Sequence, residues 1–212
     1  MTKRATTVAV RAPVARRWRK EIAHVLITDR MIARRVAALA REIERDFTGG
    51  DLMVIALLNG TVMFIGDLLR QLSQPLRLDF IGVSSYGQGT KAGPLQFTKE
   101  LRLDVQGRDV LLVDDILDTG RTLRRVLAKL RALGPKRIRT CVLLDKPSRR
   151  VEPVKVDYIG FTIPDEFVVG YGLDFAEKYR NLPFVGVLRP ELYSSPPPAP
   201  APRRGSSRPR RR

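Results

Sequence analysis

The 212-residue chain is predicted to fold as an α/β protein with a central, mostly parallel sheet flanked by helices. Three observations lead to this prediction. Short apolar runs of strand length alternate with segments whose apolar residues recur at helical spacing. The apolar runs contain few polar residues, as strands covered on both faces do. The composition, 43% hydrophobic and 29% charged, is that of a globular protein, and no internal repeat or second domain is visible.

Three segments have the periodicity of a helix. In the first, Thr28 or Asp29 can cap a helix that the pair Gly49–Gly50 is expected to end. Its apolar face comprises Ile32, Val36, Leu39, Ala40 and Ile43. The other two helices are expected over residues 61–72 and 120–133.

Strands are expected wherever a short apolar run stands between turn-forming residues. These runs cover residues 52–58, 78–83, 97–101, 109–115, 137–145, 156–160 and 184–188. Residues 84–94 are polar and rich in glycine, which is typical of a loop. The strand that follows this loop is expected to return as the second arm of a hairpin.

The net charge of +17 is concentrated at the two ends of the chain. Residues 1–20 carry seven basic side chains and no acid, and residues 194–212 carry six arginines and no acid. The C-terminal segment is built from Pro, Ser, Arg, Ala and one Gly, so it cannot bury a core and is expected to be disordered. The two ends can contact nucleic acid through charge alone, but we favour solubilising extensions. Residues 21–193 are predicted to be the folded domain.

The sequence also excludes several classes of protein. The single cysteine, Cys141, rules out an internal disulfide, and with the single histidine, His24, it rules out a zinc site. We assign both residues to structure, whereas Trp18 receives no role. No apolar run approaches the ~18 residues of a membrane helix, and the basic first segment lacks the apolar stretch of a secretory signal. The chain is therefore expected to be soluble and cytoplasmic, with no membrane partner.

Residues 110–123, VLLVDDILDTGRTL, carry the chemistry. An apolar strand delivers Asp114 and Asp115 to its carboxyl end, where ligands bind in open α/β sheets. A helix then begins, and its free N–H groups and positive dipole end suit a phosphate. The residues at this helix start are Asp118, Thr119, Gly120, Arg121 and Thr122. Because the two preceding acids cannot bind phosphate, they suit ribose hydroxyls or Mg²⁺, and the implied ligand is a sugar phosphate.

The chain contains neither of the glycine-rich motifs of nucleoside-triphosphate and dinucleotide sites. Residues 110–123 resemble instead the phosphoribosyl-pyrophosphate signature of type I phosphoribosyltransferases, and the details are similar to the hypoxanthine-guanine subfamily. The resemblance covers roughly residues 22–192. It implies the type I phosphoribosyltransferase fold, in which a small hood and a mobile lid loop accompany the central sheet.

The resemblance implies roles for four residues near a purine base. Asp118 matches the general base near purine N7, and Lys146, in the string LLDKPSRR, matches the lysine that recognises the exocyclic O6. Phe167 would stack on the base, and the backbone of Val168 would bond to the edge of the base. Each residue alone has an ordinary structural explanation, but their order along the chain favours the functional one.

A second set of implied roles concerns pyrophosphate. Leu58, Asn59 and Gly60 match the pyrophosphate loop of the family, and Arg180 would touch pyrophosphate. The resemblance also predicts a cis peptide between Leu58 and Asn59 in liganded states. Many relatives carry a basic residue where this chain has Asn59, so backbone groups are expected to supply more of the contact with pyrophosphate.

The metal and the lid complete the implied site. Asp174 would hold Mg²⁺ on the pyrophosphate side, and Asp114 and Asp115 are further candidate ligands. Asp114 stands where others in the family have glutamate, which is a conservative change. Ser85 and Tyr86 match the lid that closes over the reacting groups.

The implied activity is a purine-salvage reaction. It is the Mg²⁺-dependent transfer of 5-phosphoribose from phosphoribosyl pyrophosphate to a 6-oxopurine, hypoxanthine or guanine, which gives IMP or GMP and pyrophosphate. The family also implies a homo-oligomer, either a dimer or a tetramer. The alternative is a regulator on the same fold that binds RNA through basic surfaces and retains only vestigial activity. Asp118, Lys146, Phe167 and Asp174 favour the enzyme, because a pure binder does not need this set.

Overall fold

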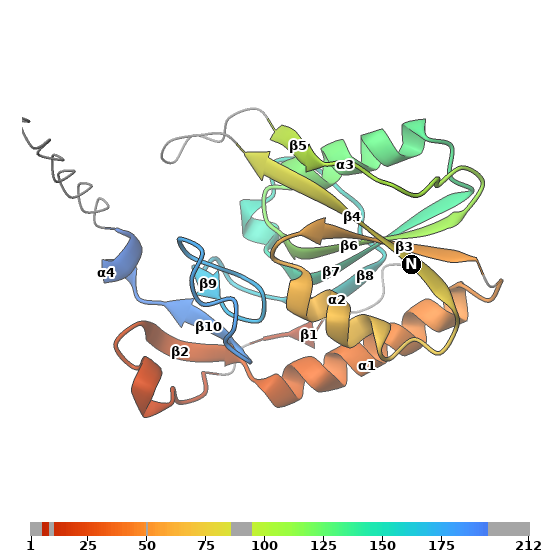
Figure 1. Ribbon diagram of the computed structural model, residues 1–212. Helices are drawn as coiled ribbons and strands as arrows, with labels where there is room; N and C mark the ends of the chain where they lie inside the picture. The colour runs from red at the N-terminus through yellow and green to blue at the C-terminus, as the bar shows by residue number, and fades with distance from the viewer. Residues whose placement is uncertain (1–5, 9–10, 50, 86–94, 195–212) are drawn as a thin grey trace, which may run out of the picture.

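The computed structural model describes residues 6–8, 11–49, 51–85 and 95–194 (Figure 1). The elements are, in chain order, β1 (Thr6–Thr7), η1 (Arg16–Trp18), β2 (Ile22–Ile27), α1 (Asp29–Asp46), β3 (Leu52–Leu58), α2 (Val62–Leu69), β4 (Leu76–Ser85), β5 (Leu95–Lys99), β6 (Asp109–Leu117), α3 (Arg121–Ala132), β7 (Arg137–Asp145), η2 (Pro147–Arg149), β8 (Tyr158–Thr162), β9 (Val168–Val169), β10 (Val185–Leu188) and α4 (Pro190–Tyr193). Most of the predicted lid, including Tyr86, and the tail from residue 195 lie outside the described residues.

A seven-stranded sheet forms the centre of the fold, in the order β1-β8-β7-β6-β3-β4-β5. Every pair of neighbouring strands is parallel except β4 and β5, which are antiparallel. The strands that follow one another through a helix are parallel because the helix returns the chain to the same end of the sheet. The predicted α/β class and the predicted hairpin arm are both confirmed.

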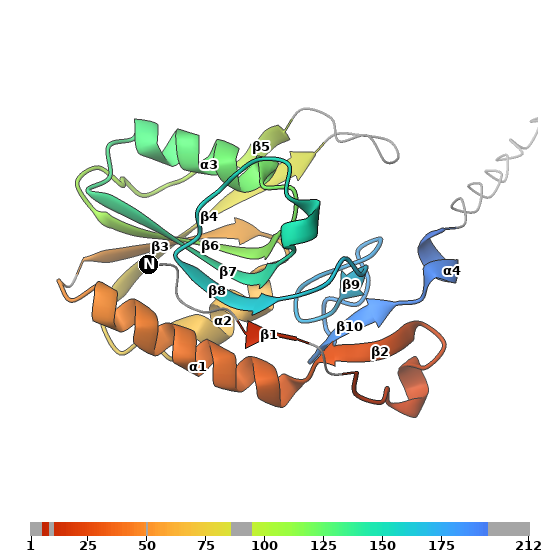
Figure 2. The ribbon, with the colours of Figure 1, turned by 180° about the vertical axis from the view of Figure 1, so that it is seen from behind.

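Helices cover both faces of this sheet, with α1 and α2 on one side and α3 on the other (Figures 1 and 2). Successive residues of a strand point to opposite faces. In β3, Val54 and Ala56 join the apolar cluster beneath α1 and α2, whereas Ile55 and Leu57 join the cluster beneath α3. Cys141 is fully buried in the first cluster, and burial raises the pKa of its thiol, so the residue is structural. No helix in the described ranges is both long and apolar enough to cross a bilayer.

Helix α1 begins as predicted and ends earlier than predicted. The hydroxyl of Thr28 accepts a hydrogen bond from the Met31 N–H at 3.3 Å, which satisfies one of the free donors of the first turn. The five residues of the predicted apolar face are all buried. The last helical residue is Asp46, because the chain turns at Phe47 to bury that side chain in the core before Gly49 is reached.

A second sheet, with the order β2-β10-β9, forms the hood that the resemblance implied. It stands beside the carboxyl ends of the parallel strands (Figure 1). One of its strands, β2, lies near the N-terminus, and the other two lie near the C-terminus; of the three, only β10 was predicted. Trp18 packs against the apolar cluster of the hood, which includes Val14, Ile22 and Leu188, so its role is structural.

Part of the basic N-terminal extension lies against the folded domain. Thr6 and Thr7 form the edge strand β1, which pairs in parallel with β8. Ala12 forms an isolated antiparallel bridge with Val25 of β2. The side chain of Arg11 reaches Glu166, with Nη2 3.3 Å from Oε1. These contacts connect the extension both to the large sheet and to the hood.

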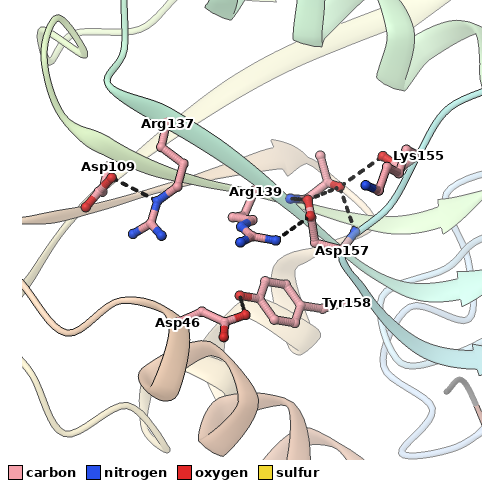
Figure 3. A network of polar contacts seen from close by, with 8 residues as sticks. Asp46, Asp109, Arg137, Arg139, Lys155, Asp157 and Tyr158 are labelled. Atoms are coloured by element: carbon pink, nitrogen blue, oxygen red, sulfur yellow. Dashed lines mark hydrogen bonds and ion pairs between the residues drawn. The ribbon is translucent and has the colours of Figure 1, made fainter. Parts of the chain in front are cut away.

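A polar network ties the amino ends of β6, β7 and β8 to the end of α1 (Figure 3). The hydroxyl of Tyr158 donates to Asp46 at 2.6 Å, and Arg139 pairs with Asp157 at 2.9 Å. The same Asp157 carboxylate accepts the backbone N–H of Thr140 at 2.9 Å. The network therefore supports the end of the sheet opposite to the predicted site.

Candidate active site

A cavity of about 1010 Å³ opens at the carboxyl ends of the central strands β3 and β6. Nine of the residues predicted for the site line it: Leu58, Gly60, Asp114, Asp115, Asp118, Thr119, Gly120, Arg121 and Thr122. Their convergence follows from the topology, because parallel neighbouring strands bring their carboxyl ends to the same edge of the sheet.

The two acids of β6 lie in the wall of this cavity, Asp114 buried and Asp115 half-buried. Asp114 is 8% exposed, and its Oδ1 accepts the N–H of Asp115 at 2.9 Å. Burial raises the pKa of both carboxyls, and the charge of Asp115 raises the pKa of Asp114 further. The positive charge of the Arg180 guanidinium lowers the pKa of Asp115. Both acids therefore favour a ligand that donates hydrogen bonds or carries positive charge.

The loop of residues 118–120, between β6 and α3 and called here the phosphate loop because it is predicted to bind phosphate, requires a glycine at its end. Gly120 has a φ of 85°, and a Cβ there would collide with the carbonyl oxygen of Glu152. The segment behind the loop is anchored to it, because Val151 and Glu152 both donate their N–H groups to the Thr119 carbonyl, at 3.0 and 2.9 Å. Gly120, the N-cap residue, has no side chain that could cap α3, the Thr119 hydroxyl accepts the Arg121 N–H at 3.4 Å, and the first turn of α3 contains no acid. The start of α3 is thus positively polarised and faces the cavity.

The loop at Leu58–Asn59–Gly60 packs tightly against the acids. The Leu58–Asn59 peptide is cis, in agreement with the prediction. A Cβ at Gly60 would collide with the carboxylate of Asp115, so only glycine allows these segments to lie this close. Leu58 and Gly60 line the cavity, whereas the Asn59 carbonyl accepts the N–H of Val62 at 3.2 Å and starts α2.

Arg180 and Asp174, both predicted for the pyrophosphate side, pair with each other. Arg180 Nη2 lies 3.0 Å from Asp174 Oδ1, and Arg180 Nη1 donates to the Gly172 carbonyl at 2.9 Å. Asp174 also accepts the N–H of Glu177 at 2.9 Å. Neither residue lines the cavity, although Arg180 is close enough to influence the ionisation of Asp115.

The residues predicted for the purine lie next to the cavity rather than in its wall. Lys146, directly after β7, is 7% exposed, and burial lowers the pKa of its ammonium while the nearby Asp118 carboxylate opposes this shift. Phe167 is 38% exposed at the start of β9. Ser85 ends β4, on the strand that leads into the predicted lid.

The backbone of Val168 is available to a ligand. Strand β9 is the outer strand of the hood sheet, and Val168 lies opposite Val187 of β10. The Phe167 carbonyl accepts the N–H of Leu188 at 2.9 Å, so the backbone groups of Phe167 face β10. Because successive residues direct these groups to alternate edges of a strand, those of Val168 face away from β10.

Two residues that the sequence analysis did not assign connect the phosphate loop with the purine residues. Arg149 Nε lies 3.2 Å from Asp118 Oδ1 and 3.8 Å from Asp165 Oδ1. Asp165 Oδ1 is in turn 3.9 Å from Lys146 Nζ. The available signal for Arg149 is its place in the string that contains Lys146, where two arginines follow the lysine closely.

Comparison with known proteins identifies the family. The phosphoribosyl transferase domain matches residues 26–176, which is more than half of the chain. The chain belongs to the phosphoribosyl transferase family. Its sheet, hood and phosphate loop are the parts of that fold that the sequence motif predicted.

Curated relatives match most of the length of this chain. A hypoxanthine-guanine phosphoribosyltransferase of Mycobacterium avium is 44% identical over 180 residues, which are 82% of this chain and 89% of that protein. The bifunctional protein TilS/HprT of Listeria innocua is 43% identical over 175 residues, again 82% of this chain but only 27% of that larger protein. The crystal structure of a hypoxanthine phosphoribosyltransferase from Staphylococcus aureus matches 86% of this chain and 100% of its own, with a TM-score of 0.81 and 38% identity.

Proposed function

We propose that the chain transfers 5-phosphoribose from phosphoribosyl pyrophosphate to hypoxanthine or guanine, with IMP or GMP and pyrophosphate as products. The observation that carries this proposal is the junction of β6 and α3. There, the buried carboxylate of Asp114 and the half-buried carboxylate of Asp115 lie beside the start of α3, whose N-cap residue is a glycine, within one cavity. Relatives named for this activity, at about the same length and more than 40% identical, support it.

The sugar phosphate would bind across this junction. The N–H groups at the start of α3 and the hydroxyls of Thr119 and Thr122 would hold the 5′-phosphate, and Arg121 would add positive charge. The carboxylates of Asp114 and Asp115 would accept hydrogen bonds from the ribose hydroxyls. A sugar held at both ends is oriented for displacement at its anomeric carbon, which lowers the entropic part of the barrier.

The residues present fit a magnesium ion. In the parts of the chain that the structure describes, no three His, Cys, Asp or Glu side chains gather as a metal site. Mg²⁺, however, is usually held by one or two carboxylates together with substrate phosphates. Asp114 and Asp115 provide such oxygens on the ribose side, and Asp174 would do so beside Arg180 on the pyrophosphate side. When bound, the ion would neutralise charge that develops on the departing pyrophosphate.

The base would be held and activated by Asp118, which lines the cavity, and by three residues that do not line it. The Lys146 ammonium would donate to the exocyclic O6, Phe167 would stack on the ring, and the outward backbone of Val168 would bond to its edge. The Asp118 carboxylate would accept or relay the N7 proton as N9 attacks. The loop Leu58–Asn59–Gly60 would contact pyrophosphate, and the lid predicted at Ser85 and Tyr86 would exclude water.

The test is a direct assay of product formation. The full chain is supplied with phosphoribosyl pyrophosphate, Mg²⁺ and hypoxanthine, guanine, xanthine or adenine in turn, and nucleotide and pyrophosphate are quantified. We expect IMP and GMP in equal molar amount to pyrophosphate, with loss of turnover when Mg²⁺ is chelated. Adenine as the preferred acceptor, or no nucleotide from any base, would contradict the proposal. The relatives lend no support to the alternative reading as an RNA-binding regulator.

Two further properties belong to the proposal. A dimer or tetramer is expected from the family, and light scattering coupled to size-exclusion chromatography measures it directly. We also propose a cytoplasmic location, which the single, buried and unpaired cysteine supports because reduced cysteines persist in that compartment.

A further inference from the structure

The aromatic ring expected to stack on the purine is itself stacked on another ring. Phe167 and Tyr193 lie with their ring centroids 4.7 Å apart and their planes inclined by 20°. Phe175 approaches the same Phe167 ring edge to face, at 5.7 Å and 89°. Tyr193 is the last residue of α4, beyond residues 26–176 that match the family. Nothing in the proposed function uses this side chain.

We propose that Tyr193 is a positioning residue for the purine base: it covers one face of Phe167 and so holds the ring with its other face toward the base. This inference rests on the proposed function and on the stacking role given there to Phe167. It assigns to α4, the element that follows the hood, a part in recognising the base.

The contact geometry favours positioning over simple burial. Both rings remain partly open, with Phe167 38% and Tyr193 37% exposed, so neither is a core residue. An exposed phenylalanine can change its side-chain rotamer unless a neighbour restricts it. An offset stack of two rings provides such a restriction and still leaves the opposite face of Phe167 to a ligand. A base bound there would extend the stack to three rings.

The backbone fixes the two residues relative to each other. The Phe167 carbonyl accepts the N–H of Leu188 at 2.9 Å, which joins it to the strand that leads into α4. Arg189, the next residue, donates its N–H to the Glu21 carbonyl at 2.8 Å and its Nε to the Arg19 carbonyl at 3.0 Å. These hydrogen bonds anchor the start of α4 both to Phe167 and to residues 19–21. The position of Tyr193 relative to Phe167 is therefore fixed.

The experiment compares four variants with the full-length parent. Tyr193→Ala removes the ring, Tyr193→Leu keeps apolar bulk without a planar face, and Tyr193→Phe keeps the face. The matched control is Leu192→Ala, an equally exposed apolar residue of the same helix. Each variant is assayed for kcat and for KM toward the base and toward phosphoribosyl pyrophosphate. The dissociation constants of GMP and of ribose 5-phosphate are measured by calorimetry.

We expect the effect to be confined to the base. Tyr193→Ala and Tyr193→Leu should raise KM for the base and the dissociation constant of GMP about 3- to 10-fold, the range that corresponds to one lost aromatic pair. KM for phosphoribosyl pyrophosphate and the affinity for ribose 5-phosphate should stay within about 2-fold. Tyr193→Phe and Leu192→Ala should match the parent in every constant.

Three results would overturn the inference. Tighter binding of GMP by Tyr193→Ala would mean that Tyr193 occupies the face that the base needs. Unchanged GMP binding would mean that the stack has no role in recognition, and an equal loss for ribose 5-phosphate would indicate a general disturbance of the site. A parent that binds GMP but forms no nucleotide would instead contradict the proposed function alone, because the GMP binding measurements still decide the role of Tyr193.

Discussion

Asp114, Asp115 and Asp118 lie within five residues of one another, yet their surroundings differ. Asp114 is buried and Asp115 half-buried, and desolvation raises the pKa of both carboxyls. Asp118 is partly exposed and lies 3.2 Å from Arg149, which places a positive charge beside its carboxylate. The three acids of this segment thus differ in burial and in neighbouring charge, and under the proposed function two of them would bind the ligand and one would accept the proton.

Replacing Asp118 tests its role as the proton acceptor. Asp118→Asn keeps the shape of the side chain but cannot take a proton, so we expect kcat to fall by up to about 10²–10⁴-fold. Binding of phosphoribosyl pyrophosphate should be retained, since the N–H groups at the start of α3 are unchanged. Steady-state kinetics and a binding titration separate the two quantities. Turnover within about 2-fold of the parent would remove Asp118 from this role.

Replacing Lys146 tests how the 6-oxo group is recognised. Lys146→Met keeps most of the buried volume but removes the charged donor, and a hydrogen bond to a charged group contributes about 1.5–3 kcal/mol. The kcat/KM for hypoxanthine should therefore fall by roughly 10- to 150-fold, while adenine, which carries an amino group at this position, should lose less. The measurement is the ratio of the two efficiencies. A ratio equal to that of the parent would contradict the assignment.

At the scale of elements, the hairpin of β4 and β5 depends on one buried acid. The carboxylate of Asp79 accepts the backbone N–H groups of Arg102 and Leu103, at 2.6 and 3.0 Å, and pairs with Lys99 at 3.0 Å. Burial alone would raise the pKa of Asp79, but hydrogen bonds from the backbone at Leu103, Phe80 and Arg102 and from Lys99 outweigh it and lower the pKa to about 2. The acid thus ties the edge strand to the sheet below the lid.

We expect Asp79→Asn to lower the free energy of unfolding by about 2 kcal/mol at pH 7. Because the pKa of the folded state lies below that of the unfolded state, this stabilisation is present above about pH 4 and is lost as the pH falls toward 2. Urea denaturation of parent and variant from pH 7 to pH 3 should therefore give converging curves. Asp104→Asn, a loss of an exposed carboxylate nearby, is the control. A pH-independent difference would contradict this assignment.

At the scale of the whole molecule, the basic ends are separate from the chemistry. Among the residues that the structure describes, the cavity is lined by residues between 57 and 152, and none of this lining comes from residues 6–8 and 11–20 or from α4. The extension nevertheless lies against the hood and the edge of the sheet, through Ala12 and through β1. The two ends carry 13 of the 17 net positive charges, so the chain between them is close to neutral.

Deleting residues 195–212 tests the independence of the C-terminal segment. This segment has little apolar surface to bury, so we expect kcat/KM and the melting temperature to stay close to those of the full chain. Weak adsorption to polyanions that is present in the full chain should be lost, because its six arginines are removed. Kinetics, calorimetry and heparin chromatography at several salt concentrations measure these effects. A large fall in turnover would show that the segment contributes to the enzyme.

Local sequence was sufficient wherever structure and site depend on neighbouring residues. The strands β3 and β7 have the predicted limits, because each is an apolar run bounded by turn-forming residues. The phosphate loop was also predictable, since an apolar strand, two acids and the start of α3 follow one another directly. Helix α1 ends at Asp46 and not at the predicted glycine pair, because the chain leaves the helix at Phe47 to bury that side chain in the core.

The remaining features depend on partners that are distant in the chain. Strand β2 pairs with β10, about 160 residues away; its residues, IAHVLI, are a short apolar run that the sequence analysis missed. The contact of Arg149 with Asp118 and the stack of Tyr193 on Phe167 likewise require that separate loops meet. Hydrophobic periodicity and helix capping are local effects that a sequence displays directly. Which side chains meet across the cavity is decided by the register of the parallel strands and by the close approach of Gly60 and Gly120, which exist only once the sheet has formed.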